Sequence, residues 1–462
     1  MRNAIEDLAI NPANPSIPVR LNLYSSFRLV LLYAILVAYS FIYEYFYGFQ
    51  LTPLFHVIFA KYDALREPVY FAIAFLTPLA IVPAGHKLRL PGQYIFYTLA
   101  VILFIPIPIV FVPMLSVPQF WHVYALLWLS YLIVSVCSSY CIEVPYILFS
   151  SDKYRHLINV VYGVITAVFA FSILKSHFSI VSLADAHQAR NLVNLNAIQV
   201  YILVAYVASF GGLLLVISIA YRNVYLTFMA FMGYIFCYGL LEERNAILMP
   251  AWLLYMYLSY RYVHRGSSWR MVLCIIAPFL IGVAFAAFIG TGNQHSVTYA
   301  AFTLANNRLF TVPAQAFNVY YNFFSQHPLT YWSHIGVVAK FVHAPYKQPL
   351  AAVMEQAYHL GEYNASFIET DGLAAAGVTA LPFVSVVVGF VMIATNTCMR
   401  GLRPDFLPLL MAGPSLAMID TGIGPSLLTN GLIALNVVIL FMPRDERWGA
   451  AETVEIMSHD AA

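Results

Sequence analysis

The sequence predicts an all-α polytopic membrane protein, and three observations support this fold class. Hydrophobic residues make up 61% of the chain and charged residues only 10%, whereas soluble domains carry roughly 25% charged residues. The apolar residues gather in segments of about 20 residues, which is the length that a helix needs to cross a bilayer. The basic residues gather in alternate connections between these segments, as expected when a chain crosses a membrane repeatedly.

Twelve membrane spans are expected. The second and the eleventh are short, and several contain proline, which bilayer helices tolerate when neighbouring groups satisfy the backbone again. Their approximate limits are 28–47, 67–83, 94–115, 121–148, 157–174, 198–220, 223–240, 246–262, 271–289, 374–397, 406–420 and 426–442.

The distribution of Lys and Arg predicts the orientation. Fifteen of the 23 basic residues lie before the first span, in alternate connections or after the last span, and the positive-inside rule makes these segments cytoplasmic. Both termini are then cytoplasmic, and one large loop lies outside. The expected organisation is a cytoplasmic segment 1–27, nine spans in 28–289, the large outer loop 290–375, three spans in 376–442 and a cytoplasmic tail 443–462.

The large outer loop is the only long polar stretch of the chain. A loop of this length is usually functional or disordered, and this one is too aromatic for disorder. Helical spacing of apolar residues predicts two helices, at 298–311 and 314–325, lying on the membrane interface. Pro349 is expected to open a third helix that ends near Gly361.

Several classes of protein are not indicated. The net charge of +2 points to no nucleic-acid partner, and no Walker A or GxGxxG motif points to nucleotide use. The sequence has no HExxH motif and no Asp-x-Asp pair for a metal ion. Cys137 and Cys141 are spaced i, i+4 on one expected helix face, but without a His or acidic partner they are expected to be small buried hydrophobes. The polar start, Met1 to Arg20, is not a cleavable signal, so the first span is expected to be permanent.

Three stretches, in this order, carry a resemblance to a known family. They are RLFTVPAQAFNVYYNFFSQHP (308–328), GEYNASFIETDGLAAAGVTAL (361–381) and PSLLTNGLI (425–433). Together, over roughly 242–442, the chain resembles the Wzy-type polysaccharide polymerases, the oligosaccharide repeat-unit polymerases of bacterial surface-glycan assembly. Relatives often have Asn-Ala-Asn-Phe where this chain has Asn364-Ala365-Ser366-Phe367, so the role of the second Asn is not carried over.

The resemblance implies a reaction, a fold and a location. The protein would be a metal-independent glycosyltransferase with a GT-C-like fold in the bacterial inner membrane, and the large loop would be periplasmic. It would use no cofactor. Donor and acceptor would be oligosaccharides linked to undecaprenyl pyrophosphate, among membrane lipids, and a chain-length-regulating co-polymerase is a further candidate partner. The alternatives are an O-antigen ligase, which transfers the glycan to lipid A core, and a transporter or flippase.

A leaving pyrophosphate needs cations, and arginine suits phosphate because its planar fork makes two hydrogen bonds at once. The candidates are Arg308, Arg244 and Arg190. The alternative role of each is a salt bridge or a lipid headgroup contact, and Glu242 and Glu243 make this alternative serious for Arg244.

An acceptor hydroxyl that attacks the anomeric carbon benefits from a general base. The candidates are Asp371, His327, His334 and Glu369, with His343 and His359 also considered. Asp371 could instead cap a helix, and His327, before a proline, could shape a turn. For substrate binding, the expected residues are Tyr321, Trp332, Tyr363 and Asn364, although an interfacial belt is the more common explanation of any single aromatic ring.

Overall fold

Helices dominate the computed structural model of the chain. The structure describes residues 23–47, 64–144, 149–176, 178–180, 195–289, 306, 309–335, 338–359, 369–445 and 448. Within these residues it contains no β-strand, and the only β-type pairing is an isolated bridge between Lys87 and Ser267. The predicted all-α class is therefore confirmed.

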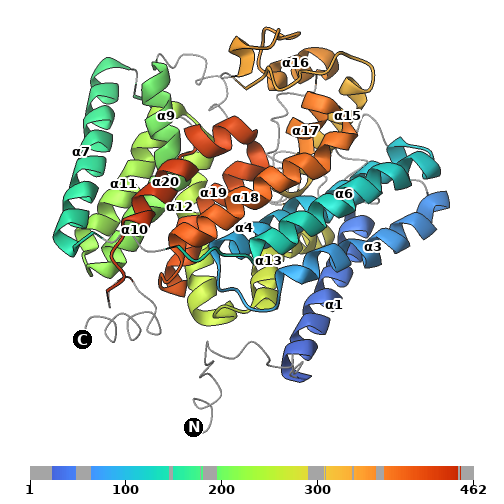
Figure 1. The fold of residues 1–462 in the computed structure, drawn as a ribbon, viewed down its shortest axis with the longest axis horizontal. Coiled ribbons are helices and arrows are strands. Elements are labelled where there is room, and N and C mark those ends of the chain that lie inside the picture. The colour runs from blue at the N-terminus through green and yellow to red at the C-terminus, as the bar shows by residue number, and fades with distance from the viewer. Residues whose placement is uncertain are drawn as a thin grey trace.

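The helices keep the order expected from the sequence (Figure 1). The described α-helices are α1 Leu23–Phe46, α3 Glu67–Ile81, α4 Pro91–Leu99, α5 Pro106–Phe111, α6 Val117–Ser138, α7 Ser151–Lys175, α9 Ala197–Ala205, α10 Gly211–Ala220, α11 Val224–Leu241, α12 Arg244–Ser259, α13 Ser268–Ile289, α15 Val312–Phe324, α16 Leu350–Tyr358, α17 Glu369–Ala376, α18 Leu381–Met399, α19 Leu407–Asp420 and α20 Leu432–Leu440. Short 3₁₀- and π-helical segments extend several of them, among them η5 Ala100–Phe104, η7 Tyr206–Phe210, η8 Tyr260–His264 and η13 Pro425–Thr429.

Eight helical segments of the described chain are long and apolar enough to cross a membrane, so the protein is a multi-pass membrane protein by this measure. Each of the eight overlaps one of the twelve expected spans. The other four expected spans fall on α12, α13, α19 and η13–α20. Over their described residues these helices are either too short or not apolar enough to be counted, so the total of twelve spans stays a prediction. The eight segments are Ser26–Phe46, Glu67–Ala84, Pro91–Met114, Val117–Ser138, Ser151–Lys175, Ala197–Ala220, Val224–Leu241 and Val378–Met399.

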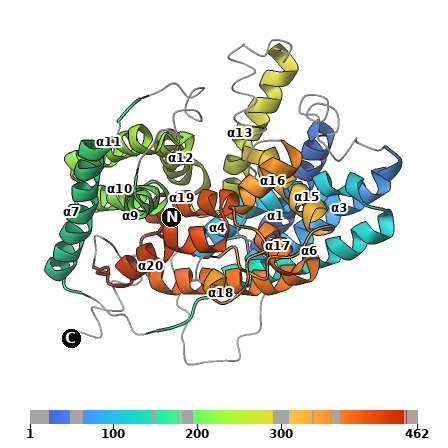
Figure 2. The ribbon, with the colours of Figure 1, turned by 90° about the horizontal axis from the view of Figure 1, so that it is seen from above.

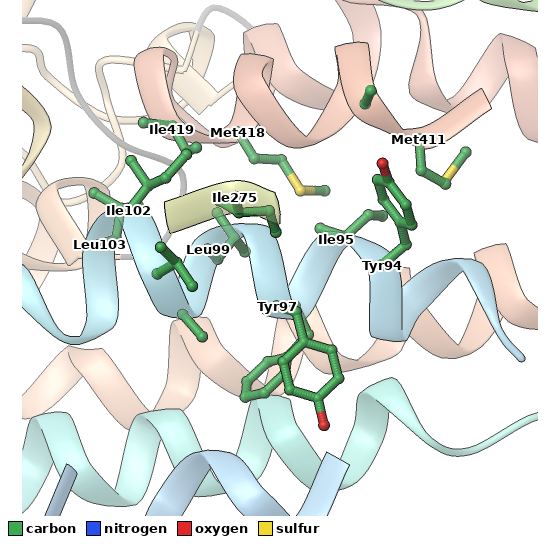
Figure 3. Packing of buried hydrophobic residues seen from close by; sticks show 14 of the residues in the cluster. Tyr94, Ile95, Tyr97, Leu99, Ile102, Leu103, Ile275, Met411, Met418 and Ile419 are labelled. Carbon is green, nitrogen blue, oxygen red and sulfur yellow. The ribbon is translucent and has the colours of Figure 1, made fainter. Parts of the chain in front are cut away.

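The segment Pro91–Met114 forms the centre of the bundle. An apolar stretch of 18 residues within it is completely buried, and Figure 2 shows α4 enclosed by other helices. Helix α4 packs on α19, and Figure 3 shows Tyr94 and Ile95 of α4 with Met411 and Met418 of α19 in the same buried cluster. A helix that is apolar on all sides is suited to such a position, because no face of it has to meet water.

Two glycines allow α19 to pack closely on the neighbouring α10 and η7. A Cβ added at Gly212 would stand 2.1 Å from the Leu409 carbonyl oxygen, and one added at Gly413 would stand 2.1 Å from the Ala208 carbonyl oxygen. Small residues at helix contacts let backbones approach in this way. The close contact fixes α19, and the turn that follows α19 is part of the site described below.

The fourth expected span ends earlier than the expected limit of 148. Helix α6 stops at Ser138, and Asn396 of α18 donates hydrogen bonds to the carbonyl oxygens of Ser138 and Tyr140 at 2.9 and 2.7 Å. The amide thus satisfies carbonyl groups that a helix end leaves free. Cys141 consequently lies beyond the helix, so the expectation that it shares a helix face with Cys137 is wrong.

Helix α15 is buried, and the expectation that this stretch lies on the membrane interface is wrong. Ten of its 13 residues are buried. It packs on α5 and α17, and Asn318 donates a hydrogen bond to the Val110 carbonyl oxygen at 3.0 Å. The aromatic residues that suggested an interface instead fill the space between helices. The third helix of the loop, α16, begins after Pro349 as expected and ends at Tyr358.

The helices α15, α16 and α17 lie together at one end of the bundle (Figure 1). The two views agree that they cover the part formed by α1, α3, α4 and α6, while α7, α10 and α11 lie to one side. The connection before α4 lies at the opposite end. About 20 residues of helix separate Leu90 from Val110, which corresponds to about 30 Å, the thickness of the hydrocarbon core of a bilayer.

Candidate functional site

Three segments that are distant in the sequence meet at Asp371. This residue lies in the first turns of α17, and its side chain is 1% exposed. Its Oδ2 accepts a short hydrogen bond from the backbone N–H of Ile423, in the turn between α19 and η13. Helix α15 packs against α17, and the charge of Asp371 contributes to raising the pKa of the Tyr320 hydroxyl on α15, after burial as the larger cause.

The turn that contacts Asp371 is shaped by a glycine. A Cβ added at Gly422 would lie 2.8 and 2.9 Å from the two carboxylate oxygens of Asp371. Real Cβ atoms essentially never approach so closely, so a larger residue here would displace the carboxylate or the turn. Glycine therefore permits the carboxylate to reach the Ile423 N–H.

The residues after this turn hold it in place. Asn430 donates a hydrogen bond from Nδ2 to the Thr421 Oγ1 at 2.9 Å, and the Ser426 hydroxyl pairs with the same Thr421 hydroxyl at 2.9 Å. The Ser426 N–H also bonds to the Gly422 carbonyl oxygen at 2.9 Å. Ser426 and Asn430 both belong to the PSLLTNGLI stretch, which thus supports the turn that binds Asp371.

The partner of Asp371 on its other side is His334. Nε2 of His334 lies 3.3 Å from Oδ1 of Asp371, and the His334 side chain is 14% exposed. Both atoms are buried, and neither has a hydrogen-bond partner among the described residues, so they face each other at 3.3 Å without an aligned hydrogen bond. The second ring nitrogen, Nδ1, lies 2.8 Å from the Thr330 hydroxyl.

The hydrogen bonds around Thr330 determine where protons lie. The Thr330 hydroxyl is 3.0 Å from the Ala374 carbonyl oxygen, which can only accept. The hydroxyl therefore donates to Ala374 and accepts from Nδ1–H of His334. Nε2 then faces Asp371 Oδ1, and two lone pairs would repel each other at this distance. A proton placed between the two atoms would replace this repulsion by attraction, so the pair has the geometry to accept one.

The segment that carries His334 is docked on the end of α17. The Thr330 and Tyr331 N–H groups donate to the carbonyl oxygens of Ala374 and Ala375 at 2.7 and 3.1 Å, which satisfies carbonyls at a helix terminus. Tyr331 and Trp332 both have positive φ angles, 49° and 66°. Side chains other than glycine rarely adopt this conformation, and strained backbone of this kind clusters at functional sites.

Two aromatic residues, Tyr331 and Trp332, lie close to His334 in the same segment. The Trp332 ring lies roughly parallel to the His334 ring, with 6.1 Å between centroids. Tyr331 is 62% exposed. Flat apolar faces beside hydrogen-bonding groups suit the binding of amphipathic ligands such as sugars.

Two other expected site residues have different contacts. The His327 ring stacks on Phe323, with 4.1 Å between centroids, and its Nδ1 is 2.9 Å from the Phe323 carbonyl oxygen, so His327 helps to end α15. Tyr321 packs edge-on against Phe111 at 4.9 Å. The structure thus places His334 beside Asp371, whereas Tyr321 lies on α15 and His327 in the turn that follows α15.

The remaining expected site residues lie outside what the structure describes. For Arg244 and Glu369 the backbone is helical, but the side chains are not described. Their roles stay predictions. The expected residues wholly outside the described chain are Arg190, Arg308, Tyr363 and Asn364.

Three contributors to the site were not expected from the sequence. Thr330 gives no signal of its own, because an isolated threonine is compatible with any exposed loop. The Gly422–Ile423 turn precedes the PSLLTNGLI stretch and contributes a glycine and a backbone N–H, neither of which is a catalytic residue type. Only the folded chain brings them to Asp371.

The comparisons with known proteins give no further guidance. No family model matches the chain. No curated protein and no solved structure matches it either.

Proposed function

We propose that the protein is a metal-independent membrane glycosyltransferase that polymerises oligosaccharide repeat units linked to undecaprenyl pyrophosphate. The observation that carries this proposal is the contact of Asp371 with His334 and with the Ile423 N–H. Asp371 belongs to the second of the three stretches that resemble the polysaccharide polymerases, and the two residues that it contacts flank the others: His334 follows the first stretch and Ile423 precedes the third. Ile423 lies about 50 positions from Asp371 in the sequence, so its contact is not a consequence of chain proximity.

The pair is proposed to accept the proton of the attacking hydroxyl. Without a shared proton, the pair carries one negative charge. The acceptor hydroxyl oxygen then forms a bond to the anomeric carbon, its proton passes to the His334–Asp371 pair, and the pyrophosphate leaves with the electrons of the broken C–O bond. The proton is afterwards released to solvent through the partly exposed His334. General base catalysis of this kind typically contributes about 10²- to 10⁴-fold.

The acceptor must first reach the pair, since both facing atoms are buried. The segment 330–335 is the covering element that carries His334, and Tyr331 and Trp332 hold its backbone in a strained conformation. A shift of this segment would expose Nε2 and relieve strain. The exposed ring of Tyr331 and the half-buried ring of Trp332 are proposed to bind the acceptor sugar.

The leaving group is proposed to be bound by Arg308, Arg244 and Arg190, each of which can stabilise phosphate charge. In this proposal the site faces the periplasm and the bundle lies in the inner membrane. The opposite end, with the connections rich in Lys and Arg, faces the cytoplasm.

The reaction with purified protein and purified lipid-linked repeat units tests the proposal. A ladder of products on a gel, formed without added metal or nucleotide, is the expected result. A protein that leaves single repeat units unchanged but transfers them to lipid A core would be a ligase. In a deletion strain, loss of a polymerase leaves single repeat units on the core, whereas a bare core would contradict polymerisation.

A transporter is less well supported by the described chain. A transporter needs charged groups within its spans, and Glu143, which falls in the fourth expected span, lies beyond the end of α6 and is 83% exposed. It pairs with Arg400 at 2.8 Å. It therefore does not line a path through the bundle, as a transport residue would.

A further inference from the structure

A second site lies at the other end of the bundle. A cavity of about 410 Å³ opens between the beginning of α1, the connection before α4 and the connection between η8 and α13. Five cationic side chains line it, and no Asp or Glu is among its described lining residues. The cations are Arg28, Lys87, Arg89, Arg265 and Arg270.

The two connections that carry most of these cations are joined by backbone hydrogen bonds. The Leu88 N–H donates to the Gly266 carbonyl oxygen at 2.7 Å, and the Ser268 N–H donates to the His86 carbonyl oxygen at 3.1 Å. The bridge between Lys87 and Ser267 lies between these two bonds. We call this paired backbone, 86–88 with 266–268, the clip. Like charges on two loops repel each other, so the clip keeps cationic side chains close together that would otherwise move apart.

The positive field of the cavity reaches neighbouring groups. The pKa of His86 is lowered by partial burial and then by the charges of Lys87, Arg28 and Arg89. The acidic residue Asp405 directly follows the lining residue Pro404 in the sequence, and Arg403 binds it through hydrogen bonds of 3.1 and 2.6 Å. The field is therefore not neutralised from the lining itself.

One residue that lines the cavity, His264, has a buried donor without a partner among the described residues. His264 is 0% exposed and lines the cavity. Its Nδ1 accepts a hydrogen bond from the Gly266 N–H at 3.4 Å, so the neutral ring carries its proton on Nε2. That Nε2–H has no partner among the described residues. Leaving a buried donor unsatisfied is unfavourable, and an anion that accepts this hydrogen bond would remove the cost.

The N-terminus of α13 adds further donors. Ser267, Trp269 and Arg270 line the cavity at the start of this 22-residue helix. The N–H groups of a first turn have no partner within the helix, and the helix dipole places partial positive charge there. Helix starts of this kind bind phosphate groups.

The walls of the cavity are partly apolar. Phe27, which is 63% exposed, and Leu31 belong to the first turns of α1, and Trp269 begins α13. Aromatic rings at helix ends are typical of the membrane interface. A soluble anion would need none of this apolar surface, whereas the glycerol and first acyl carbons of a phospholipid would cover it.

We propose that this cavity binds the phosphodiester headgroup of an anionic phospholipid at the membrane face opposite to the His334–Asp371 pair. Basic pockets between membrane helices on the cytoplasmic side bind such headgroups in other proteins. The site is separate from the proposed reaction and does not depend on it. Bound lipid would tie α1 to α13 across the clip between 86–88 and 266–268.

The test uses the purified full-length protein in detergent and native mass spectrometry. Dioleoylphosphatidylglycerol is the anionic probe, dioleoylphosphatidylcholine the zwitterionic one, and inorganic phosphate the soluble one. Lys87→Gln together with Arg89→Gln removes two exposed cations of the cavity. Lys153→Gln together with Arg155→Gln is the matched control, because it removes an exposed Lys and an exposed Arg of the same spacing from the start of α7.

The expected result is that the protein binds phosphatidylglycerol in preference to phosphatidylcholine. The cavity variant should bind phosphatidylglycerol about 30-fold more weakly, because each of the two cations contributes about 1 kcal/mol to the attraction of an anionic lipid. The control variant should bind it almost as well as the unmodified protein. Equal binding of the two lipids, or equal weakening in both variants, would overturn the proposal. Displacement of phosphatidylglycerol by millimolar inorganic phosphate would show that the site takes a soluble phosphate compound, and would overturn the lipid assignment. Equal thermal midpoints of the two variants ensure that folding does not explain the difference.

Discussion

The exchange Asp371→Asn tests the proposed pair most directly, because it keeps the shape of the side chain. The Ile423 N–H requires an acceptor, so the amide oxygen is expected to stay at the Oδ2 position and the NH₂ group to face His334 Nε2. The amide then donates to the Nε2 lone pair. Because Nδ1–H is held by Thr330, the imidazole is fixed as a neutral ring with no free basic nitrogen.

The size of the effect follows from this proton arrangement. The variant cannot accept the proton of the attacking hydroxyl, so the whole contribution of the base is lost. We expect a decrease in the rate of glycan transfer of about 10²- to 10⁴-fold, equivalent to about 3–5 kcal/mol of transition-state stabilisation. The fold should be kept, because the hydrogen bond from Ile423 remains.

The assay is the conversion of purified lipid-linked repeat units by equal amounts of purified protein, followed as product ladders over time. Asp405→Asn is the matched control, because Asp405 is also a paired carboxylate but lies near the opposite cavity, where it binds Arg403. This control should retain nearly full activity. His334→Gln should lose as much activity as Asp371→Asn, and the double variant no more than either, since residues that act as a unit are not additive.

Two outcomes would refute the reasoning about the pair. Full activity of Asp371→Asn would show that the carboxylate is structural. Losses that multiply in the double variant would show that His334 and Asp371 act separately.

Three further predictions concern other residues. Gly422→Ala should reduce the rate of glycan transfer about 10- to 100-fold by displacing the Asp371 carboxylate. The control Gly163→Ala, where an added Cβ meets nothing within 4 Å, should keep its activity. Equal activity of the two variants would show that the turn at Gly422 is not part of the site. Arg308→Ala should abolish polymer while the protein stays in the membrane, and Arg308→Lys should restore it partly; a fully active alanine variant, read on the same gels, would remove this assignment. Burial lowers the pKa of the His264 imidazole to about 4, so the unfolded chain binds a proton at His264 more readily than the folded protein does. The free energy of unfolding should therefore fall by about 2 kcal/mol as the pH is lowered from 8 to 5. His264→Gln should remove that part of the acid sensitivity of the thermal midpoint, and an unchanged pH dependence would contradict it.

The sequence alone determined the fold class and most of the helices. Runs of about 20 apolar residues leave the chain few structures other than membrane helices, because every backbone polar group in a bilayer must be paired within the protein. This constraint acts locally, so hydropathy finds the spans. The sequence also placed Asp371 and His334 among the candidates, because carboxyl and imidazole groups can act as a general base and both residues lie in the large outer loop.

The tertiary structure alone decided which candidates act together. Local pattern could not show that α15 is buried, since the aromatic residues that suit a membrane interface also suit a helix contact. It could not show that the turn at Gly422 meets Asp371, because that contact joins residues about 50 positions apart through a backbone N–H that every residue except proline possesses. The same holds for the cationic cavity. Positive charge on two connections predicts only which end of the bundle faces the cytoplasm, whereas the backbone hydrogen bonds between the two connections bring the cations together around one cavity.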